Sequence, residues 1–389
     1  MRPLVLTENY PPDRGGMAQS CDRIVRSLRA SGLPVDVAHV GRKVPRPRVE
    51  PQEGGLLVSA PSDEDPAHAI HLLWNEVRRL TVPPSHVVAF GGATPILAAP
   101  AFAAWLGVPL VTLLRGNDFD TGLFSLRRGW ALRDALARSA AVATVSRDHQ
   151  RKVAALFPSA DVRFVPNGID AADWTLVPHD LERAALFRAE HVGAGRRLVG
   201  MFGHLKQKKG GAFFLEALRR AGVDGLLHLL VVGDAEPEML AHLASIESSV
   251  PWTHVPFVDR YELLPYYAAC DAIVVPSFYD GMPNVLLEAG VLGVPPVAST
   301  AGGMADLLED GVNAITFAPG DVHDCRRALS DAATIPLEEL RLRGARLKET
   351  VLRDYRHDLE AARYAALLEE TTGRASRAAG TNALTESRT

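Results

Sequence analysis

Residues 276–290 read PSFYDGMPNVLLEAG, a loop that leads from the end of an apolar strand pattern into a helical pattern. In open α/β sheets, ligands bind at the carboxyl ends of the strands, and the first turn of a helix presents unpaired backbone N–H groups to anions. Asp280 lies in the loop, and Glu288 lies two helical turns into the helix. Because an ionised carboxylate accepts hydrogen bonds from neighbouring hydroxyl groups, this pair predicts a site for a hydroxyl-rich ligand at the edge of a parallel sheet.

Short apolar runs that predict strands surround this stretch. In the second half of the chain they lie at 198–202, 226–232, 254–258, 272–275, 296–299 and 314–317. In the first half they lie at 4–7, 35–40, 87–90, 110–114, 141–145 and 162–165. Several runs are apolar throughout, which is typical of strands covered by helices on both faces. We therefore expect an α/β fold with two doubly wound, Rossmann-like domains.

The length of 389 residues also favours two domains, because it exceeds what one hydrophobic core usually organises. A polar stretch at 171–196 separates the two series of strands, and helical patterns follow at 337–352 and 354–370. The polar segment from Gly373 has a composition typical of disorder. We expect domains at 1–172 and 173–353, a C-terminal helix at 354–372 that packs back toward the first domain, and a disordered tail at 373–389.

The composition argues against several other kinds of protein. A formal net charge of −4 gives no overall attraction to nucleic acid or to anionic lipid. Cys21, Cys270 and Cys325 form no zinc-binding pattern and indicate structural thiols in a reducing compartment. No run reaches the length of about 20 apolar residues that a membrane-spanning helix needs, and the N-terminal apolar run is too short for a signal peptide. We therefore expect a cytoplasmic protein.

Residues 276–289 also resemble the E-x7-E signature of the large family-4 group of retaining GT-B glycosyltransferases, with Asp280 and Glu288 at the two acidic positions. Further matching motifs stand in the order of that family. They are Gly15-Gly16, Asn167-Gly168-Ile169-Asp170, and Phe202-Gly203-His204-Leu205 followed by Lys209-Gly210. The resemblance implies a GT-B architecture, in which an acceptor-side domain and a donor domain face each other across a cleft. It also implies transfer of a hexose-type sugar from a nucleotide diphosphate sugar with retention of configuration.

The resemblance implies a role for each matching position. Lys209 would neutralise the donor diphosphate, Glu288 would bind the ribose hydroxyls, and Asp280 would bind the hydroxyls of the donor sugar. Gly15 and Gly16 would close over the phosphates from the first domain. Backbone amides around the start of the helix would face the sugar and phosphate, in the segment formed by Gly281, Met282, Pro283, Asn284 and Val285.

Two positions depart from the family pattern. His204 stands where the family has an arginine that grips the diphosphate, and a histidine is charged only when protonated. Lys206 or Lys208 would then supply the missing positive charge. Asp280 is one methylene shorter than the family's glutamate, so we expect its contact with the sugar to be shifted or mediated by water.

A dense polar set, Arg115 to Asp120, follows the strand at 110–114. Asn117 and Asp118 are the candidates to contact the donor sugar or the acceptor, and they complete the expected catalytic set with Lys209 and Asp280. Asp118-Phe119-Asp120 also spells the D-x-D of metal-dependent GT-A enzymes. Two parallel α/β halves argue against that class, so we expect neither a metal ion nor a cofactor besides the nucleotide-sugar co-substrate.

Other interpretations of the same residues stay open. Asp280 and Glu288 also fit a helix-entry acid and a solvated helix glutamate. A GT-B phosphorylase, a sugar-nucleotide epimerase or a catalytically weakened partner of another transferase would share the fold. The four arginines between Leu126 and Arg138 suit an anionic acceptor or a membrane surface, but a solvated helix face is the interpretation that we favour for them.

The sequence leaves the acceptor open, because acceptor pockets are built from first-domain loops without a transferable pattern. A polysaccharide or glycolipid precursor and a natural product are the classes considered. From family frequency we expect UDP as the nucleotide and GDP as the next choice. The Ala, Arg and Gly content indicates a GC-rich bacterial source, no nucleic-acid partner is expected, and the oligomeric state is open.

Overall fold

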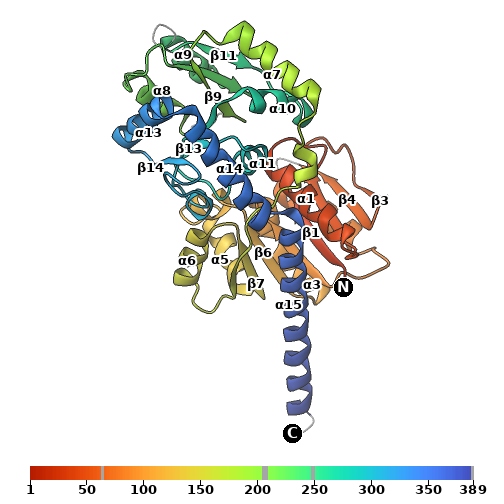
Figure 1. Cartoon of the computed structure of the whole chain (residues 1–389). Helices are drawn as coiled ribbons and strands as arrows, with labels where there is room; N and C mark the ends of the chain where they lie inside the picture. Colours follow the sequence, from red (N-terminus) through yellow and green to blue (C-terminus); the bar gives the residue numbers. More distant parts are fainter. Residues whose placement is uncertain (63–64, 204–208, 247–249, 387–389) are drawn as a thin grey trace. The chain divides into compact units, whose positions relative to one another are not determined.

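The computed structural model describes residues 1–62, 65–203, 209–246 and 250–386, apart from the side chains of Asn117, Ile246 and residues 374–386. The chain divides into two compact units. Unit 1 comprises Met1–Asn167 and His357–Thr389, and unit 2 comprises Gly168–Arg356. Each unit is built on a sheet of mainly parallel strands with helices on it, and Figure 1 shows their elements coloured along the sequence.

Unit 1 is built on an eight-stranded sheet in the order β3-β4-β2-β1-β5-β6-β7-β8. Only the β3–β4 pair is antiparallel. The strands are β1 Pro3–Thr7, β2 Asp36–Gly41, β3 Arg48–Gln52, β4 Gly55–Pro61, β5 His86–Phe90, β6 Leu110–Leu114, β7 Ala141–Thr144 and β8 Val162–Phe164. The helices are α1 Gly16–Ala30, α2 Pro66–Val77, α3 Ala93–Leu106, α4 Asn117–Asp120, α5 Gly129–Arg138, α6 Arg147–Leu156 and α15 His357–Glu386.

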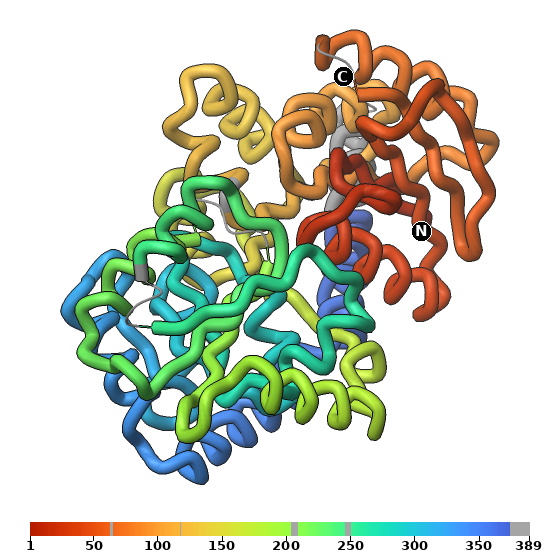
Figure 2. The backbone as a smooth tube through the Cα atoms, turned by 90° about the horizontal axis from the view of Figure 1, so that it is seen from above, coloured from red at the N-terminus to blue at the C-terminus, as the bar shows by residue number. Residues whose placement is uncertain are grey.

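Helices cover both faces of this sheet. Val5 of β1 belongs to a buried cluster with α1 and α15, whereas Leu4 and Leu6 belong to a cluster with α2 and α3. Because successive side chains of a strand point to opposite faces, an all-apolar strand serves both clusters. The helix α15 lies beside α1, although the whole chain separates them in sequence (Figures 1 and 2).

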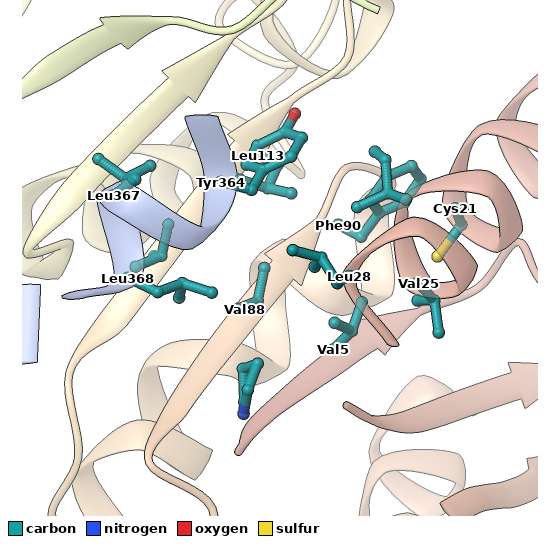
Figure 3. A pocket seen from close by; sticks show the side chains of 13 residues that line it. Val5, Cys21, Val25, Leu28, Val88, Phe90, Leu113, Tyr364, Leu367 and Leu368 are labelled. Carbon is teal, nitrogen blue, oxygen red and sulfur yellow. The ribbon is translucent and has the colours of Figure 1, made fainter. Parts of the chain in front are cut away.

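A small apolar cavity lies under α15 in unit 1. It has a volume of about 20 Å³, and Cys21, Phe90, Tyr364 and Leu368 are among the side chains around it (Figure 3). Burial raises the pKa of the Cys21 thiol to about 12, so this cysteine is an inert packing residue. The cavity holds no more than a water-sized volume and lies within the core, so it is not the donor site.

Unit 2 is built on a six-stranded sheet in the order β11-β10-β9-β12-β13-β14, with every recorded pair parallel. The strands are β9 Arg197–Phe202, β10 Leu227–Val232, β11 Trp252–Val255, β12 Ala272–Val275, β13 Pro296–Ser299 and β14 Ile315–Phe317. The helices are α7 Pro178–His191, α8 Gly211–Arg219, α9 Pro237–Ile246, α10 Arg260–Ala269, α11 Asn284–Leu292, α12 Met304–Leu307, α13 Val322–Thr334 and α14 Leu337–Asp354, with a 3₁₀ turn at Ala171–Trp174.

The expected α/β fold with two Rossmann-like units is confirmed, and most of the expected strands lie within a residue or two of the observed ones. The hairpin of β3 and β4 was not expected. The edge strand β3 is mostly exposed and contains Pro51, so it lacks an apolar run of the kind by which the expected strands were identified. Strand β4 contains the apolar run 56–58 and was missed as well. The strand expected at 254–258 begins earlier, at Trp252.

The two segments that connect the units differ slightly from the expected boundaries. The units divide after Asn167 and after Arg356, rather than after 172 and 353. The physical reason is that the contacts change sides between two neighbouring residues. The Asn167 side chain accepts a hydrogen bond from Arg115 of unit 1. The Ile169 N–H donates to the Tyr355 carbonyl of unit 2 at 2.8 Å. The last helix continues to Glu386 instead of ending near 372.

Candidate functional site

The strand order of unit 2 reverses beside β9, because β9 pairs with β10 on one side and with β12 on the other. Ligands of open α/β sheets bind beyond the carboxyl ends of the strands at such a switch point. The loop after β9 contains Lys209, and the loop after β12 contains Asp280. The fold therefore brings together the two loops that the sequence motifs single out.

Lys209 and Asp280 form an ion pair between these two loops, from Nζ to Oδ2. The other carboxylate oxygen, Oδ1, accepts a hydrogen bond from the Gly281 N–H at 3.0 Å. The Lys209 side chain is 31% exposed and that of Asp280 is 14% exposed, so both charges lie at the surface of the sheet edge within reach of a ligand. The contact places a cation and an anion where a charged, hydroxyl-rich ligand would meet both.

Two glycines permit the close approach of these loops. Gly210 has a φ of +71°, and a Cβ there would overlap the carbonyl oxygen of Pro276. Gly302 has a φ of +54°, and a Cβ there would overlap the carbonyl oxygen of Asp280. The neighbouring Gly303 N–H donates to the Gly281 carbonyl at 2.7 Å. The backbone at Asp280 and Gly281 is thus held against the end of β13.

We expect Gly302→Ala to destabilise the protein by about 1–3 kcal/mol, because alanine at this positive φ is strained and its Cβ would also push the Asp280 loop away. Gly222→Ala is the matched control, since Gly222 has a φ of +69° but no atom near its Cβ position. Urea denaturation of both variants measures the difference. Equal losses of stability would show that the contact with Asp280 contributes nothing beyond the backbone strain.

Glu288 lies on α11 with only 9% of its surface exposed, and its Oε2 accepts a hydrogen bond from the Tyr267 hydroxyl at 2.7 Å. Burial and the nearby Glu288 charge raise the pKa of Tyr267 well above its usual value, so the phenol stays a hydrogen-bond donor. The Tyr267 ring stacks on Phe202 at the end of β9, with the ring centroids 3.9 Å apart. Glu288 is therefore fixed in orientation and is not a solvated helix residue.

The remaining expected donor-binding residues of unit 2 lie in the loop that leads from Asp280 into α11 and at the start of that helix. Met282 is buried, Pro283 precedes α11 in an extended conformation, and Asn284 and Val285 begin the helix. Pro283 occupies the N-cap position of α11, and its side chain makes no capping hydrogen bond. His204, Lys206 and Lys208 lie outside the described residues.

In unit 1 the strand order reverses beside β1, which pairs with β2 and with β5. Gly15 directly precedes α1 with a φ of +113°, and Gly16 is the first helical residue, so both lie beyond the carboxyl end of β1. Glu8 follows the same strand, and its carboxylate accepts from the Ala93 and Thr94 N–H groups at 3.1 and 3.0 Å. The chain thus supplies its own anion at the start of α3.

Asp118 lies at the same carboxyl edge, and its carboxylate accepts hydrogen bonds from the backbone N–H of Arg115 at 2.8 Å and of Phe119 at 3.2 Å. Burial raises its pKa. A Cβ placed on Gly91, at the end of β5, would lie 3.0 Å from an oxygen of this carboxylate. Asn117 begins α4, but its side chain lies outside the described residues. Asp118 therefore shapes its own loop at the carboxyl edge of the unit 1 sheet.

Asp120, the second acid of the D-x-D pattern, has a different partner. Its Oδ2 lies 2.9 Å from Nε2 of the buried His149. Burial acts to raise the pKa of Asp120, but His149 and Lys152 outweigh that effect and lower it. The two acids are therefore engaged separately, Asp118 with backbone groups and Asp120 with side chains of α6.

The pattern of motifs missed the buried hydrogen-bond network of Arg115. Its Nη1 donates to the Tyr364 hydroxyl at 2.9 Å, its Nη2 donates to Asn167, and its guanidinium lies 4.9 Å from the centre of the Phe90 ring. Nη2 also lies 3.9 Å from the buried Glu360. Tyr267 was missed as well. No local signal identifies these two residues, because their hydrogen-bond partners lie 21 to 249 positions away along the chain.

Two Rossmann-like units with polar groups at the carboxyl edges of their sheets are the architecture that the resemblance to GT-B glycosyltransferases implied. The chain belongs to the family-4 type of these enzymes. A family model described as Glycosyltransferase Family 4 matches residues 14–173, and one described as Glycosyl transferases group 1 matches residues 196–334. The resemblance stated from the motifs is thereby confirmed at the level of the family.

Curated relatives are glycosyltransferases of several kinds. Glycogen synthase of Mycobacterium tuberculosis is 27% identical over 265 residues, which cover 65% of this chain and 61% of that protein. The match thus spans less than two thirds of that relative's length. A GDP-mannose-dependent α-(1-6)-phosphatidylinositol monomannoside mannosyltransferase of Mycolicibacterium smegmatis is 27% identical over 381 residues, which cover 89% of this chain and 97% of that protein.

Solved structures share the fold. Sucrose-phosphate synthase from Thermosynechococcus elongatus matches with a TM-score of 0.80 at 16% identity, over 96% of this chain and 99% of that one. HepE of Anabaena in complex with UDP-glucose matches with a TM-score of 0.75 at 17% identity, over 95% of this chain and all of that one. Within the residues described, no helix is long and apolar enough to cross a membrane.

Proposed function

We propose that this glycosyltransferase moves a hexose-type sugar from a nucleotide diphosphate sugar to an acceptor, with retention of configuration and without a metal ion. The observation that carries the proposal is the Lys209–Asp280 pair at the switch point of unit 2, beside the start of α11. A cation and backbone amides suit a diphosphate, and a carboxylate suits sugar hydroxyls. Glu288, oriented by Tyr267, supplies the carboxylate for the ribose.

The ion pair indicates that Asp280 positions Lys209 in addition to binding the sugar. In the chain alone, Asp280 holds the Lys209 ammonium at the sheet edge. When the donor binds, the diphosphate attracts the ammonium, and the carboxylate then accepts hydrogen bonds from the sugar. The shorter side chain of aspartate is sufficient for this geometry, because the Gly281 N–H already fixes Oδ1.

In the proposed reaction the bond between the anomeric carbon and the phosphate oxygen breaks, and the acceptor oxygen bonds to the same face of the sugar. The acceptor's proton passes to the departing phosphate oxygen, so no enzyme nucleophile is needed. Lys209 stabilises the charge that develops on the leaving group. Asn117 and Asp118 of unit 1 are the proposed contacts for the sugar or the acceptor.

UDP remains the proposed nucleotide, with GDP next. HepE was solved with UDP-glucose, and the mannosyltransferase of M. smegmatis is named as GDP-mannose-dependent. The acceptor of that mannosyltransferase is named as a phosphatidylinositol monomannoside. This relative supports a glycolipid precursor over a natural product as the proposed acceptor class.

The test is a thermal-shift screen of the purified protein against UDP, GDP, ADP, dTDP and CDP. A ligand at about 100 times its dissociation constant adds about 2.7 kcal/mol of stability. We expect one diphosphate to raise the melting temperature of the wild type and to have no effect on Glu288→Ala. If the same diphosphate raised the melting temperature of Glu288→Ala as much as that of the wild type, the nucleotide would bind at another site. No stabilisation by any diphosphate would favour a binding partner of another transferase.

Retention is tested separately, by following the anomeric configuration of the product by NMR once the donor is known. We expect the configuration of the donor to be kept. An inverted product would contradict the same-face mechanism. Release of nucleotide diphosphate that depends on the acceptor would also exclude the epimerase and phosphorylase alternatives.

A further inference from the structure

An exposed patch of apolar and cationic side chains lies between α4 and the second turn of α5 in unit 1. Phe124 is 85% exposed, Leu126 is 100% exposed and Trp130 is 61% exposed. Three exposed arginines lie among them. The set, called the 124–133 patch below, consists of Phe124, Leu126, Arg127, Arg128, Trp130 and Arg133.

The three arginines of the 124–133 patch have no ion-pair partner among the residues described. The nearby Arg138 differs, because it pairs with Asp134 at 2.7 Å. On a chain with a formal net charge of −4, the patch is a local concentration of positive charge. Its charge therefore complements an anionic surface and is not neutralised by the protein itself.

The apolar side chains of the patch are exposed because their neighbours take the available core positions. Leu123 and Leu132 pack in a core cluster of unit 1, and Gly129 and Ala131 are also buried. Side chains adjacent to these positions in the loop and on the helix consequently point outward. Single exposed apolar residues are ordinary, but a group of three large ones beside unpaired cations marks an interaction surface.

The patch lies directly after the Asp118 loop. A Cβ on Gly122 would overlap the Asp118 carbonyl oxygen, and the Leu123 N–H donates to the Phe119 carbonyl at 2.9 Å. Because α5 begins in the connection from β6 to β7, Trp130 in its first turn lies toward the carboxyl edge of the sheet. The 124–133 patch and the candidate acceptor residues are thus at the same edge of unit 1.

We infer that the 124–133 patch docks unit 1 on an anionic lipid bilayer. Phe124, Leu126 and Trp130 insert at the level of the headgroups, where aromatic side chains are favoured, while the arginines contact lipid phosphates. A second copy of the chain fits less well, because a twofold contact through this patch would bring unpaired arginines together. The solvated helix face favoured from the sequence does not account for the exposed Phe124 and Leu126, which precede the helix.

The inference goes beyond the proposed function, and its test needs no sugar transfer. We expect the full chain to cosediment with vesicles of phosphatidylcholine and phosphatidylglycerol and not with phosphatidylcholine alone. Removing two surface cations with Arg127→Gln/Arg128→Gln should weaken the association roughly thirtyfold. The matched control is Arg42→Gln/Lys43→Gln, which removes two adjacent exposed cations elsewhere in unit 1 and should change little.

Insertion is measured through tryptophan fluorescence with brominated lipids, which quench only side chains that enter the bilayer. The expected quenching is lost in Trp130→Phe and kept in Trp105→Phe. Trp105 is a suitable control, because it is 58% exposed but lies at the end of α3, at the opposite edge of the sheet. Phe124→Ser/Leu126→Ser should reduce binding to the anionic vesicles by tenfold or more, on the order expected for two buried apolar side chains.

Three outcomes would overturn the inference. The first is that the wild type does not bind anionic vesicles. The second is that the Arg42/Lys43 control weakens binding as much as the Arg127/Arg128 variant does. The third is that the fluorescence of Trp130→Phe is still quenched by the brominated lipids. Light scattering without lipid examines the second-copy alternative. A dimer that Leu126→Ser dissociates would assign the patch to self-association instead.

Discussion

Lys209→Ala is expected to lower kcat/KM for the donor by about two to three orders of magnitude, the loss typical of removing a group that stabilises charge in the transition state. The Lys209 ammonium pairs with Asp280 at the sheet edge, and in the proposed reaction alanine would leave the departing diphosphate without this charge. Stability should change by less than about 1 kcal/mol, because the pair is partly exposed to water. The measurement is the release of nucleotide diphosphate, together with thermal melting of the same sample.

Lys348→Ala is the matched control for the loss of a lysine charge from unit 2, since Lys348 is exposed on α14 away from the carboxyl edge loops. It should keep full activity. Asp280→Asn keeps the shape of the carboxylate but removes its charge, so it tests together the two proposed tasks of Asp280, which are to hold the ammonium and to accept hydrogen bonds from the sugar. Activity in Lys209→Ala within a factor of about three of the wild type would remove this lysine from the mechanism.

Arg115→Met is expected to destabilise the protein by about 3 kcal/mol, at the lower end of the range for breaking a buried charged network. The substitution removes the hydrogen bonds to Tyr364 and Asn167. Glu360 keeps Arg23, whose Nε lies 3.0 Å from its Oε2, which limits the loss. Tyr364 and Glu360 belong to α15, and Asn167 ends the first segment of unit 1. The variant therefore loosens the attachment of α15 and of the end of that segment to the rest of unit 1.

Urea denaturation measures this loss, and two variants calibrate it. Tyr364→Phe removes one hydrogen bond of the network and should cost about 1 kcal/mol. Arg163→Met removes an arginine that also contacts α15, through Glu370 at 3.0 Å, but this arginine is 42% exposed and should cost less than about 1 kcal/mol. If Arg115→Met were as stable as Arg163→Met, the buried network would contribute no more to the free energy of unfolding than the exposed ion pair does.

The carboxyl-edge loops show how far local patterns reach. All-apolar strands and the strand-loop-helix motif around Asp280 predicted two parallel sheets with polar groups at their edges, because strands buried on both faces and a helix start after a strand each have a recognisable local sequence pattern. The same patterns missed β3, whose exposed residues carry no such trace. The proposed roles of Gly15, Gly16, Asn117, Asp118 and Glu288 in binding stay predictions.

What the sequence alone determined was the fold class, the family, the position of Lys209 and Asp280 on loops at a sheet edge and that of Glu288 on the helix that follows, since periodicity and short motifs are properties of neighbouring residues. Only the tertiary structure decided that Lys209 pairs with Asp280, that Tyr267 orients Glu288 and that Arg115 joins Asn167 to α15. It alone also decided that Phe124, Leu126 and Trp130 face outward. These facts depend on contacts between distant residues and on which side chains the core leaves uncovered, and neither is encoded in a local pattern.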